Sequence, residues 1–450
     1  MRRFAAALWA LGLACADATE TTPTVDAGST VDAGSTVDAG PGPAVVYYRD
    51  IKPILETHCT GCHSPGGIGP IDLTVPAVAV AARTLVKAQV ESGLMPPWHA
   101  APECRGYLDE RRLTAAELQA LGEWSDLGGP LGDERDAAAP IAPPPPAIRV
   151  DKRLPTSEAY SATAGDDYRC FVLEWDEAAP KFVTGFNLLP SNQAIVHHAN
   201  IYVAEPNGVA AYRTKDAAAE GPGYPCFGGA FEPGSALLGA WAPGSNGIEY
   251  PAGTGVQIDP GSVIVMEMHF YVGDPNNNQD QSTLALELAD TVERRALVAP
   301  FWNFQEWSQG RNMPIPADQA DVMHSITFDP NGFVPLIAPW LTNRAIKIYG
   351  AGLHMHYLGT RGTVAIRRPN ADECLLEIPR WDFNWQYGYL FTEPTDFLIG
   401  EDRLYLECHW NNTAANQPII GGARREVRDV NWGGRSTDEM CIGYVYVTER

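Results

Sequence analysis

Four consecutive prolines, Pro143 to Pro146, constrain the fold of this chain more than any other feature. Proline lacks a backbone N–H and fixes φ at about −65°, so such a run joins neither a helix interior nor a sheet and instead extends. It lies within Asp136–Ile148, which we expect to be a stiff spacer. Residues 16–46 repeat Val-Asp-Ala-Gly-Ser-Thr, carry five acidic residues and contain no Lys or Arg, which predicts a disordered tether. The two stretches therefore predict separate folded parts between and after them.

The composition is that of an acidic globular protein. Among 450 residues, 32 are Lys or Arg and 55 are Asp or Glu, for a formal net charge of −23. This balance argues against nucleic acid and anionic membrane surfaces as partners, because both attract basic patches. The 43 Gly and 37 Pro favour β-structure rich in turns.

The N-terminus has the pattern of an export signal. Arg2 and Arg3 precede an apolar run, Phe4–Ala14, that is too short to span a bilayer. Ala14-Cys15-Ala16 fits a cleavage site, whereas Cys15 also resembles the lipidated cysteine of bacterial lipoproteins. We expect a signal sequence over residues 1–15 and an exported protein, periplasmic or held at the outer membrane or cell surface. Its membrane contact would be limited to an N-terminal lipid.

Cys59-Thr60-Gly61-Cys62-His63 is the attachment signature of c-type haem. The thiols of Cys59 and Cys62 can add to two vinyl groups, which places His63 beneath the iron. A zinc site would need four ligands, and Cys104 is the only further cysteine nearby; a bare dithiol would be oxidised outside the cell. The motif therefore predicts haem c.

The surrounding sequence predicts a small all-α cytochrome domain over residues 47–135. Helices are expected over Tyr47–His58 and Ala77–Ser92, and a third should begin at Thr114, which forms a capping box with Glu117. The segment resembles cytochrome domains of bacterial exported proteins.

The sixth haem ligand is less determined by the sequence. Met95 follows the second helix at a suitable distance, and two prolines stiffen its loop. A thioether raises the reduction potential of haem iron. We favour Met95 as the axial ligand opposite His63, with His99 or no residue as the alternatives.

The sequence changes character after residue 149. Short runs with β-propensity are separated by Gly, Pro and Asn clusters, without a long helical period: Lys181–Leu188, Val196–Val203, Val263–Val272, Ile346–Tyr349, Thr363–Arg367 and Arg403–Trp410. This pattern is typical of antiparallel sandwiches, and the length predicts two of them.

The histidines of this part occur in pairs. Chance predicts roughly 0.2 adjacent pairs and roughly 0.2 His-x-His pairs, yet one of each is present, at the spacings of metal sites. His354 and His356 would point to one face of a strand. His197 and His198 would point to opposite faces, so both bind one ion only if the backbone bends or they use different ring nitrogens. His269 could supply a third imidazole.

Three imidazoles suit copper and zinc equally well. Met440 could join His354 and His356 in a softer site that holds Cu(I), although methionine is more often a core residue.

The order of motifs, HH, then MHFY, then LHMHYLGT, then DEMC, resembles the copper type II ascorbate-dependent monooxygenases over about residues 150–450. These include peptidylglycine α-hydroxylating and dopamine β-monooxygenases. The resemblance implies two eight-stranded jelly-roll domains that face each other across a cleft, each with one copper. It implies that His197, His198 and His269 hold the electron-transfer copper. His354, His356 and Met440 would hold the catalytic, oxygen-binding copper.

The resemblance also implies disulfides Cys170–Cys226 and Cys408–Cys441. Cys104 and Cys374 have no counterparts in the family. They could join the cytochrome to the second sandwich, but we expect two free buried thiols.

Some positions depart from the family pattern. Gly352 stands where peptide-amidating relatives have the arginine that binds the substrate carboxylate, so a C-terminal glycine peptide is not the expected substrate. Tyr444 matches a substrate-contacting tyrosine, whereas Ile442 replaces an asparagine and Glu267 a glutamine.

The expected organisation is a signal sequence (1–15), a disordered tether (16–46), a cytochrome domain (47–135), a proline-rich spacer (136–148) and two copper monooxygenase sandwiches (149–298 and 299–450). The expected activity is hydroxylation of a C–H bond of a small organic substrate with O₂, two coppers and haem c. Electrons would come from an ascorbate-like reductant or an electron-transfer protein. The alternative is a non-catalytic copper and haem protein that relays electrons or binds copper.

Overall fold

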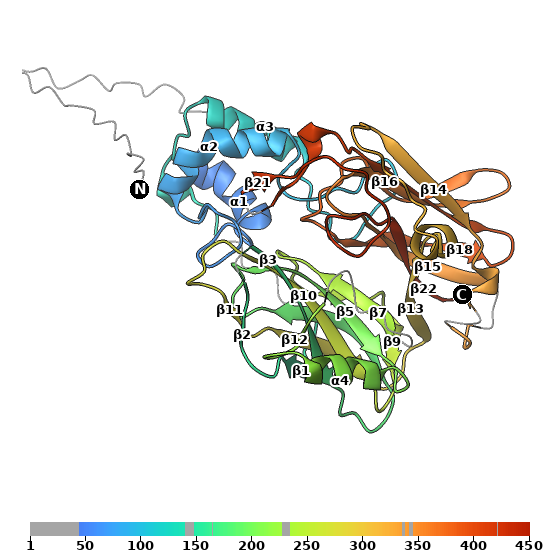
Figure 1. Cartoon of the computed structure of the whole chain (residues 1–450). Helices are drawn as coiled ribbons and strands as arrows, with labels where there is room; N and C mark the ends of the chain where they lie inside the picture. The colour runs from blue at the N-terminus through green and yellow to red at the C-terminus, as the bar shows by residue number, and fades with distance from the viewer. Residues whose placement is uncertain are drawn as a thin grey trace, which may run out of the picture. The chain divides into compact units, whose positions relative to one another are not determined.

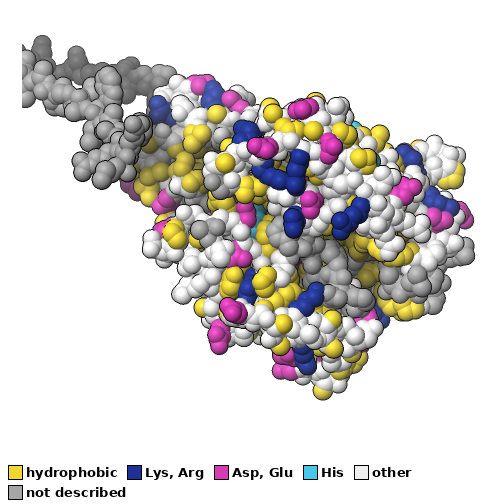
Figure 2. All heavy atoms as spheres, in the orientation of Figure 1, with side chains coloured by type: hydrophobic (Ala, Val, Ile, Leu, Met, Phe, Trp, Pro, Cys, Tyr) yellow, Lys and Arg dark blue, Asp and Glu magenta, His cyan; other side chains and the backbone are white. Residues whose placement is uncertain are grey.

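A computed structural model describes residues 45–139, 148–163, 165–226, 235–334, 338–341, 345–420 and 422–450. The predicted signal sequence, Cys15, all but the end of the tether, and most of the proline spacer lie outside these residues. Val45–Arg450 forms one compact unit and is described by itself. Within the described residues, no helix combines the length and apolarity needed to cross a membrane. On the face drawn in Figure 2, Lys and Arg side chains are interspersed with Asp and Glu.

The helices predicted around the Cys-x-x-Cys-His motif are confirmed (Figure 1). A short π-helix, η1 (Tyr47–Ile51), leads into α1 (Lys52–His58), and α2 (Pro76–Glu91) and α3 (Ala115–Asp126) follow. The capping box at the start of α3 is present, with Glu117 N–H bonded to Thr114 and the Glu117 carboxylate bonded to Thr114 N–H. The helices enclose a core built around Tyr47, Leu55 and Trp124. Whether this module is a cytochrome stays a prediction.

The first β-sandwich packs two sets of strands around one apolar core. The strands β3 (Gly165–Glu174), β5 (Val196–Ala204), β7 (Ser235–Trp241) and β10 (Val263–Val272) form one set. The strands β1 (Lys152–Pro155), β4 (Lys181–Leu189), β9 (Thr254–Ile258) and β12 (Thr283–Ala289) form the other. Side chains from both sets meet in the core, among them Ile201 and Ile264 from the first and Phe186 and Leu286 from the second.

The second β-sandwich is likewise built from two sets of strands. One set of strands is β14 (Val322–Phe328), β16 (Gly359–Arg367), β17 (Asp372–Ile378) and β19 (Arg403–Trp410). The other is β15 (Ala345–His354), β18 (Gly388–Leu398) and β22 (Ile442–Glu449). Strand β13 (Arg294–Phe301) pairs with β22 and also with β7 and β9, so hydrogen bonding continues from one sandwich into the other.

The remaining elements are short. They are β2 (Tyr160–Ser161), β6 (Tyr224–Pro225), β8 (Ile248–Glu249), β11 (Gln279–Asp280), β20 (Ile419–Ile420), β21 (Ala423–Arg424), η2 (Glu134–Asp136), η3 (Phe304–Gln309), η4 (Pro330–Gly332), η5 (Ala414–Asn416) and the helix α4 (Val209–Ala218). The sequence did not predict α4, whose residues Val209 and Tyr212 are buried.

Three disulfides are present. Cys170–Cys226 and Cys408–Cys441 confirm the pairs implied by the family resemblance. The expectation of free thiols at Cys104 and Cys374 was wrong, because these residues form a third disulfide across a sequence separation of 270.

The third disulfide belongs to a broad contact between the N-terminal module and the second sandwich. Tyr107 is buried there and its hydroxyl donates to Leu375 O at 3.2 Å. Arg105 forms a 2.6 Å ion pair with Glu373 on β17. The backbone N–H of Leu108 donates to Leu390 O at 2.8 Å. The helical module is therefore docked on the sandwich rather than only tethered to it.

We expect the double variant Cys104→Ala/Cys374→Ala to lose about 3–5 kcal/mol of unfolding free energy, because this disulfide closes a very long loop. The matched control, Cys170→Ala/Cys226→Ala, opens a loop of separation 56 and should lose less. Urea unfolding under non-reducing conditions measures both. An unfolding midpoint for the first variant equal to that of the parent would contradict the expectation.

Candidate metal centres

The first sandwich gathers three imidazoles at the ends of two paired strands. His197 and His198 lie near the start of β5, and His269 lies on β10 opposite His198. The pairing of β10 with β5 shifts between His269 and Phe270, so His197 occupies a β-bulge. The backbone bends there, which lets adjacent histidines turn to one point although an ideal strand would separate them.

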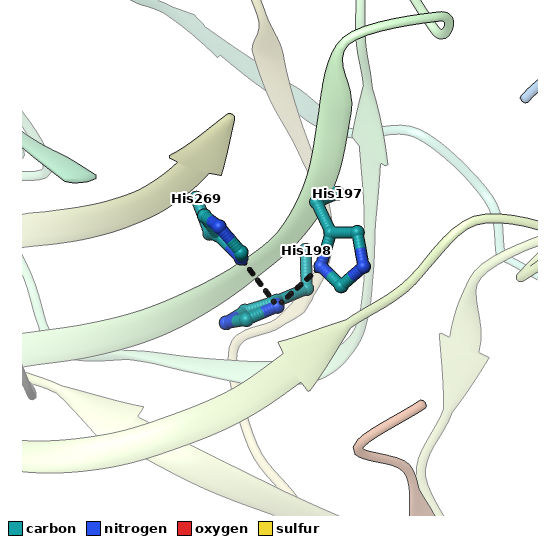
Figure 3. A group of neighbouring side chains, drawn as sticks. All are labelled: His197, His198 and His269. Carbon is teal, nitrogen blue, oxygen red and sulfur yellow. Dashed lines mark hydrogen bonds between the residues drawn. The ribbon is translucent and has the colours of Figure 1, made fainter. Parts of the chain in front are cut away.

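The three Nδ1 atoms converge (Figure 3). His198 Nδ1 lies 3.1 Å from His197 Nδ1 and 3.4 Å from His269 Nδ1. Imidazole nitrogens bound to one divalent ion at about 2.0 Å are themselves roughly 3.3–3.5 Å apart. The spacing therefore suits a single metal ion. The residues fit copper, since imidazole is one of its common ligands.

Asp166 and Tyr168 on β3 hold His269 in place. Asp166 Oδ1 lies 2.8 Å from His269 Nε2, and the Tyr168 ring stacks on the imidazole at 4.2 Å with an interplanar angle of 4°. A carboxylate on one ring nitrogen fixes the tautomer and leaves the other nitrogen for a metal. The sequence alone indicates neither residue, because only the register of β3 against β10 brings them to His269.

Burial keeps this cluster uncharged. Desolvation lowers the pKa of His197, and it holds the pKa of His198 and of His269 well below the ordinary value. The imidazoles are therefore neutral at pH 7, which is the form that binds a metal ion.

We expect Asp166→Ala to weaken Cu(I) binding at this cluster about 10–100-fold, because ligand orientation is lost. Competition with a chromophoric Cu(I) chelator gives the affinity. Asp290→Ala is the matched control, since Asp290 is exposed and pairs only with Lys181 among the interactions described. Equal affinities for the two variants would show that Asp166 does not orient His269.

The second cluster lies at the end of β15. His354 is the last residue of the strand and His356 follows just beyond it, so strand alternation does not explain their common direction as the sequence analysis expected. The ring centroids are 5.0 Å apart. His354 Nδ1 lies 2.6 Å from Gln386 Oε1, and His356 Nδ1 lies 3.1 Å from Asp438 O. Both Nδ1 atoms are thus engaged, which leaves the Nε2 atoms for a metal.

Burial also keeps this pair neutral. Desolvation lowers the pKa of His354 to about 4 and that of His356 to about 3. The hydrogen bond that Gln386 Oε1 accepts from His354 Nδ1 partly offsets the effect of burial on the pKa of His354.

Met440 lies on the segment that adjoins both imidazoles. Asp438, two residues before Met440, has its backbone oxygen within hydrogen-bond distance of His356 Nδ1. Ile442, two residues after Met440, is the β-sheet partner of His354. Met440 is 6% exposed, and Cys441 fixes the segment to β19 through the bond to Cys408. The assignment of Met440 and the histidines as ligands stays a prediction.

Glu439 anchors the same segment, although no pattern in the sequence indicates this role. Its carboxylate accepts hydrogen bonds from His356 N at 2.9 Å, Leu358 N at 2.7 Å and Trp410 Nε1 at 2.8 Å. One fully buried side chain therefore joins the His-x-His turn to the segment that carries Met440.

The Cys-x-x-Cys-His motif lies between α1 and α2. Cys59 and Cys62 are free thiols, and burial raises the pKa of Cys59 to about 12. His63 Nδ1 lies 3.1 Å from Ile71 O, which leaves Nε2 available. Met95 packs against the same helical core as Cys59.

Comparison with known proteins identifies the two sandwiches. The family model described as copper type II ascorbate-dependent monooxygenase, N-terminal domain, matches residues 155–279, and the C-terminal domain of the same family matches residues 334–449. Together the matches span more than half of the chain. The chain belongs to this family. The first match contains His197, His198 and His269, and the second contains His354, His356 and Met440.

Membership makes the protein an oxidoreductase of the copper-dependent monooxygenase type, and it implies O₂, a small-molecule substrate and a reductant. No curated protein matches the chain. Among solved structures, PNGase F, a glycosylasparaginase from Flavobacterium meningosepticum, covers 66% of this chain and 96% of its own at 12% identity, with a TM-score of 0.29. The infectious bursal disease virus VP2 subviral particle covers 69% of this chain and 75% of its own at 10% identity, with a TM-score of 0.16.

Both clusters border one cavity of about 150 Å³. Its lining includes His198 from the first cluster, His354 and His356 from the second, and Glu267, Phe383 and Tyr444. Glu267 is 3% exposed and accepts a hydrogen bond from Asn200 Nδ2 at 3.1 Å. Gly352 pairs with Tyr444 in the wall of this cavity.

Proposed function

We propose that the protein is an exported copper-dependent monooxygenase that hydroxylates a C–H bond of a small organic substrate with O₂. The observation that carries this proposal is the placement of one imidazole cluster in each family-matched domain, both bordering a single cavity. Copper bound there would supply one-electron redox chemistry and activation of O₂.

The two histidine clusters would have different roles. His197, His198 and His269 would hold the electron-transfer copper, with Asp166 and Tyr168 orienting His269. His354, His356 and Met440 would hold the catalytic copper, where the soft thioether favours Cu(I) over Cu(II). Gln386 and Asp438 O fix the two ring orientations at this second site.

We further propose that Cys59 and Cys62 carry haem c. Two free thiols fit covalent attachment, and the His63 Nδ1 contact with Ile71 O fits a ring whose Nε2 faces iron. Met95, which packs against the same helical core as Cys59, would be the second ligand of the iron. Haem would supply electrons one at a time, as the copper chemistry needs.

The cavity favours neutral or cationic substrates over carboxylates. Its described lining contains the buried Glu267 and no Lys or Arg. Among the side chains of the lining, a carboxylate would find no cationic partner to offset its lost hydration. Tyr444, in the wall beside Gly352, would contact the substrate.

Export is supported by the three disulfides, since such bonds persist in oxidising compartments. The N-terminal motif supports either periplasmic release or a lipid anchor on Cys15.

Measurements of the copper and haem content per chain, combined with measurements of O₂ uptake, test the proposal. We expect two coppers and one covalent haem per chain, and reductant-dependent O₂ uptake that places one ¹⁸O atom from ¹⁸O₂ in the product. The panel should compare small amines and alcohols with matched carboxylates. Full copper and haem loading without uptake on any panel member would instead favour a protein that relays electrons or binds copper.

A further inference from the structure

One loop of the second sandwich reaches imidazoles of both histidine clusters. We define the connecting loop as residues 382–387, between β17 and β18. We propose that the connecting loop couples the two metal sites, so that copper held by one cluster raises the affinity of the other cluster for copper. The inference rests on the proposed function and adds a property that two separately built sites would not have.

The connecting loop supports His197 of the first cluster. Asn384 forms a side-chain hydrogen bond with His197, whose Nδ1 lies 3.1 Å from His198 Nδ1. Burial lowers the pKa of His197, and the bond to Asn384 opposes this effect, as an acceptor for a ring N–H does. Such a partner fixes the orientation in which the ring offers its other nitrogen to a metal ion. Asn384 therefore supports His197 as Asp166 supports His269.

The same loop supports His354 of the second cluster. Gln386 Oε1 accepts a hydrogen bond from His354 Nδ1 at 2.6 Å, which leaves His354 Nε2 for copper. Gln386 Nε2 donates to Phe383 O at 2.9 Å, so the side chain is fixed to its own loop. Each cluster thus contains one imidazole whose orientation depends on the connecting loop.

The ring of Phe383 contacts imidazoles of both clusters. Its centroid lies 6.3 Å from that of His269 and 6.2 Å from that of His356. Phe383 is buried, and the Tyr357 ring packs against it at 4.2 Å. Since buried side chains are closely packed, a displacement of the connecting loop would disturb the packing of both clusters at once.

Bonds within the connecting loop join its two supporting side chains. Asn384 N and Nδ2 donate to Asp382 Oδ1 at 2.9 and 2.8 Å, and Trp385 N donates to Asp382 O at 3.1 Å. Together with the bond from Gln386 to Phe383 O, these contacts make one turn that carries both Asn384 and Gln386. Copper at one cluster would hold this turn in place. Binding at the other cluster then costs less conformational entropy, which is a source of positive coupling.

Coupled loading has a consequence for the proposed reaction. A chain with one copper lacks either the electron-transfer site or the oxygen-binding site, and coupling keeps this form scarce when copper is limiting. Linkage requires that each site raise the affinity of the other by the same factor. Asn384 and Gln386 act as positioning residues, because they contact the imidazoles and not the metal.

A Cu(I) titration against a chromophoric chelator measures the coupling. The full chain is used with Cys59 and Cys62 either carrying haem or alkylated, so that their thiols do not compete for copper. Two variants each retain one cluster: His354→Ala/His356→Ala and His197→Ala/His198→Ala/His269→Ala. Independent sites would make the binding curve of the parent equal to the sum of these two curves. We expect the parent instead to bind its second copper about fivefold or more tightly than that sum gives.

The coupling factor should depend on Asn384. With Asn384→Ala added to the parent and to both single-cluster variants, the three curves should become additive. Asn384→Asp keeps an acceptor oxygen and should retain most of the factor. Asn276→Ala is the matched control and should retain all of it. Asn276 is exposed like Asn384, and its N and Nδ2 donate to Asp274 Oδ1 at 2.9 and 3.0 Å in the same local arrangement.

Each outcome bears on the proposal. Additive curves in the parent would overturn it, and so would a coupling factor that persists in Asn384→Ala or is lost equally in Asn276→Ala. If a single-cluster variant does not fold, native mass spectrometry at one copper per chain replaces the comparison. The parent should then contain a smaller fraction of singly loaded chains than Asn384→Ala, and equal fractions would overturn the coupling. A parent that binds no copper at either cluster would refute the proposed function instead.

Discussion

Replacing Met440 by isoleucine should abolish product formation while the first copper site stays loaded. The side chain keeps its apolar character, but the thioether is lost from the segment that adjoins His354 and His356. Without a soft ligand the second site should bind Cu(I) much less tightly, and we expect the rate of product-linked O₂ uptake to fall at least about a hundredfold.

X-ray absorption on the copper-loaded protein provides an independent readout. The parent should show a copper–sulfur contribution for the Cu(I) state, and Met440→Ile should lack it. Met313→Ile is the matched control, because Met313 is fully buried in the core of the same sandwich. Equal activity of Met440→Ile and the parent would remove Met440 from the site.

Local patterns in the sequence predicted the elements and the chemistry-bearing residues. Strand β10 was expected at the bounds it has, Val263–Val272, because apolar and β-branched residues mark it directly. The capping box of Thr114 and Glu117 depends on residues three apart, so it too could be predicted. The paired histidines drew attention because their spacing alone is improbable.

What the sequence could not predict depends on register between distant strands. Asp166 supports His269 only because β3 and β10 align across about a hundred residues of chain. The bulge at His197 depends on how β5 pairs with β10, and the sequence of either strand alone does not determine that pairing. The bond between Cys104 and Cys374 was missed for a related reason: six cysteines allow many pairings, and docking of the helical module decides among them.

Replacing Glu439 by leucine should be among the most destabilising single changes in the second sandwich. The carboxylate is fully buried, and three N–H groups donate to it, from His356, Leu358 and Trp410. Burial raises its pKa to about 8, an effect that these hydrogen bonds oppose. Leucine would fill the space but leave buried donors without acceptors, at a cost of about 3–5 kcal/mol in unfolding free energy.

The same change should also affect the metal site, since Glu439 joins the His356 turn to the segment of Met440. We expect Glu439→Leu to unfold at lower urea concentration and to bind Cu(I) more weakly at the second cluster, whereas Glu439→Gln, which keeps an acceptor oxygen, should lie between it and the parent. Glu407→Leu on β19 is the matched control. Its partners, His409 and Tyr405, are partly exposed, so the loss should stay within about 1 kcal/mol. Similar losses for Glu439→Leu and Glu407→Leu would mean that the buried carboxylate does not anchor the segment, and the position of Met440 would then need another cause.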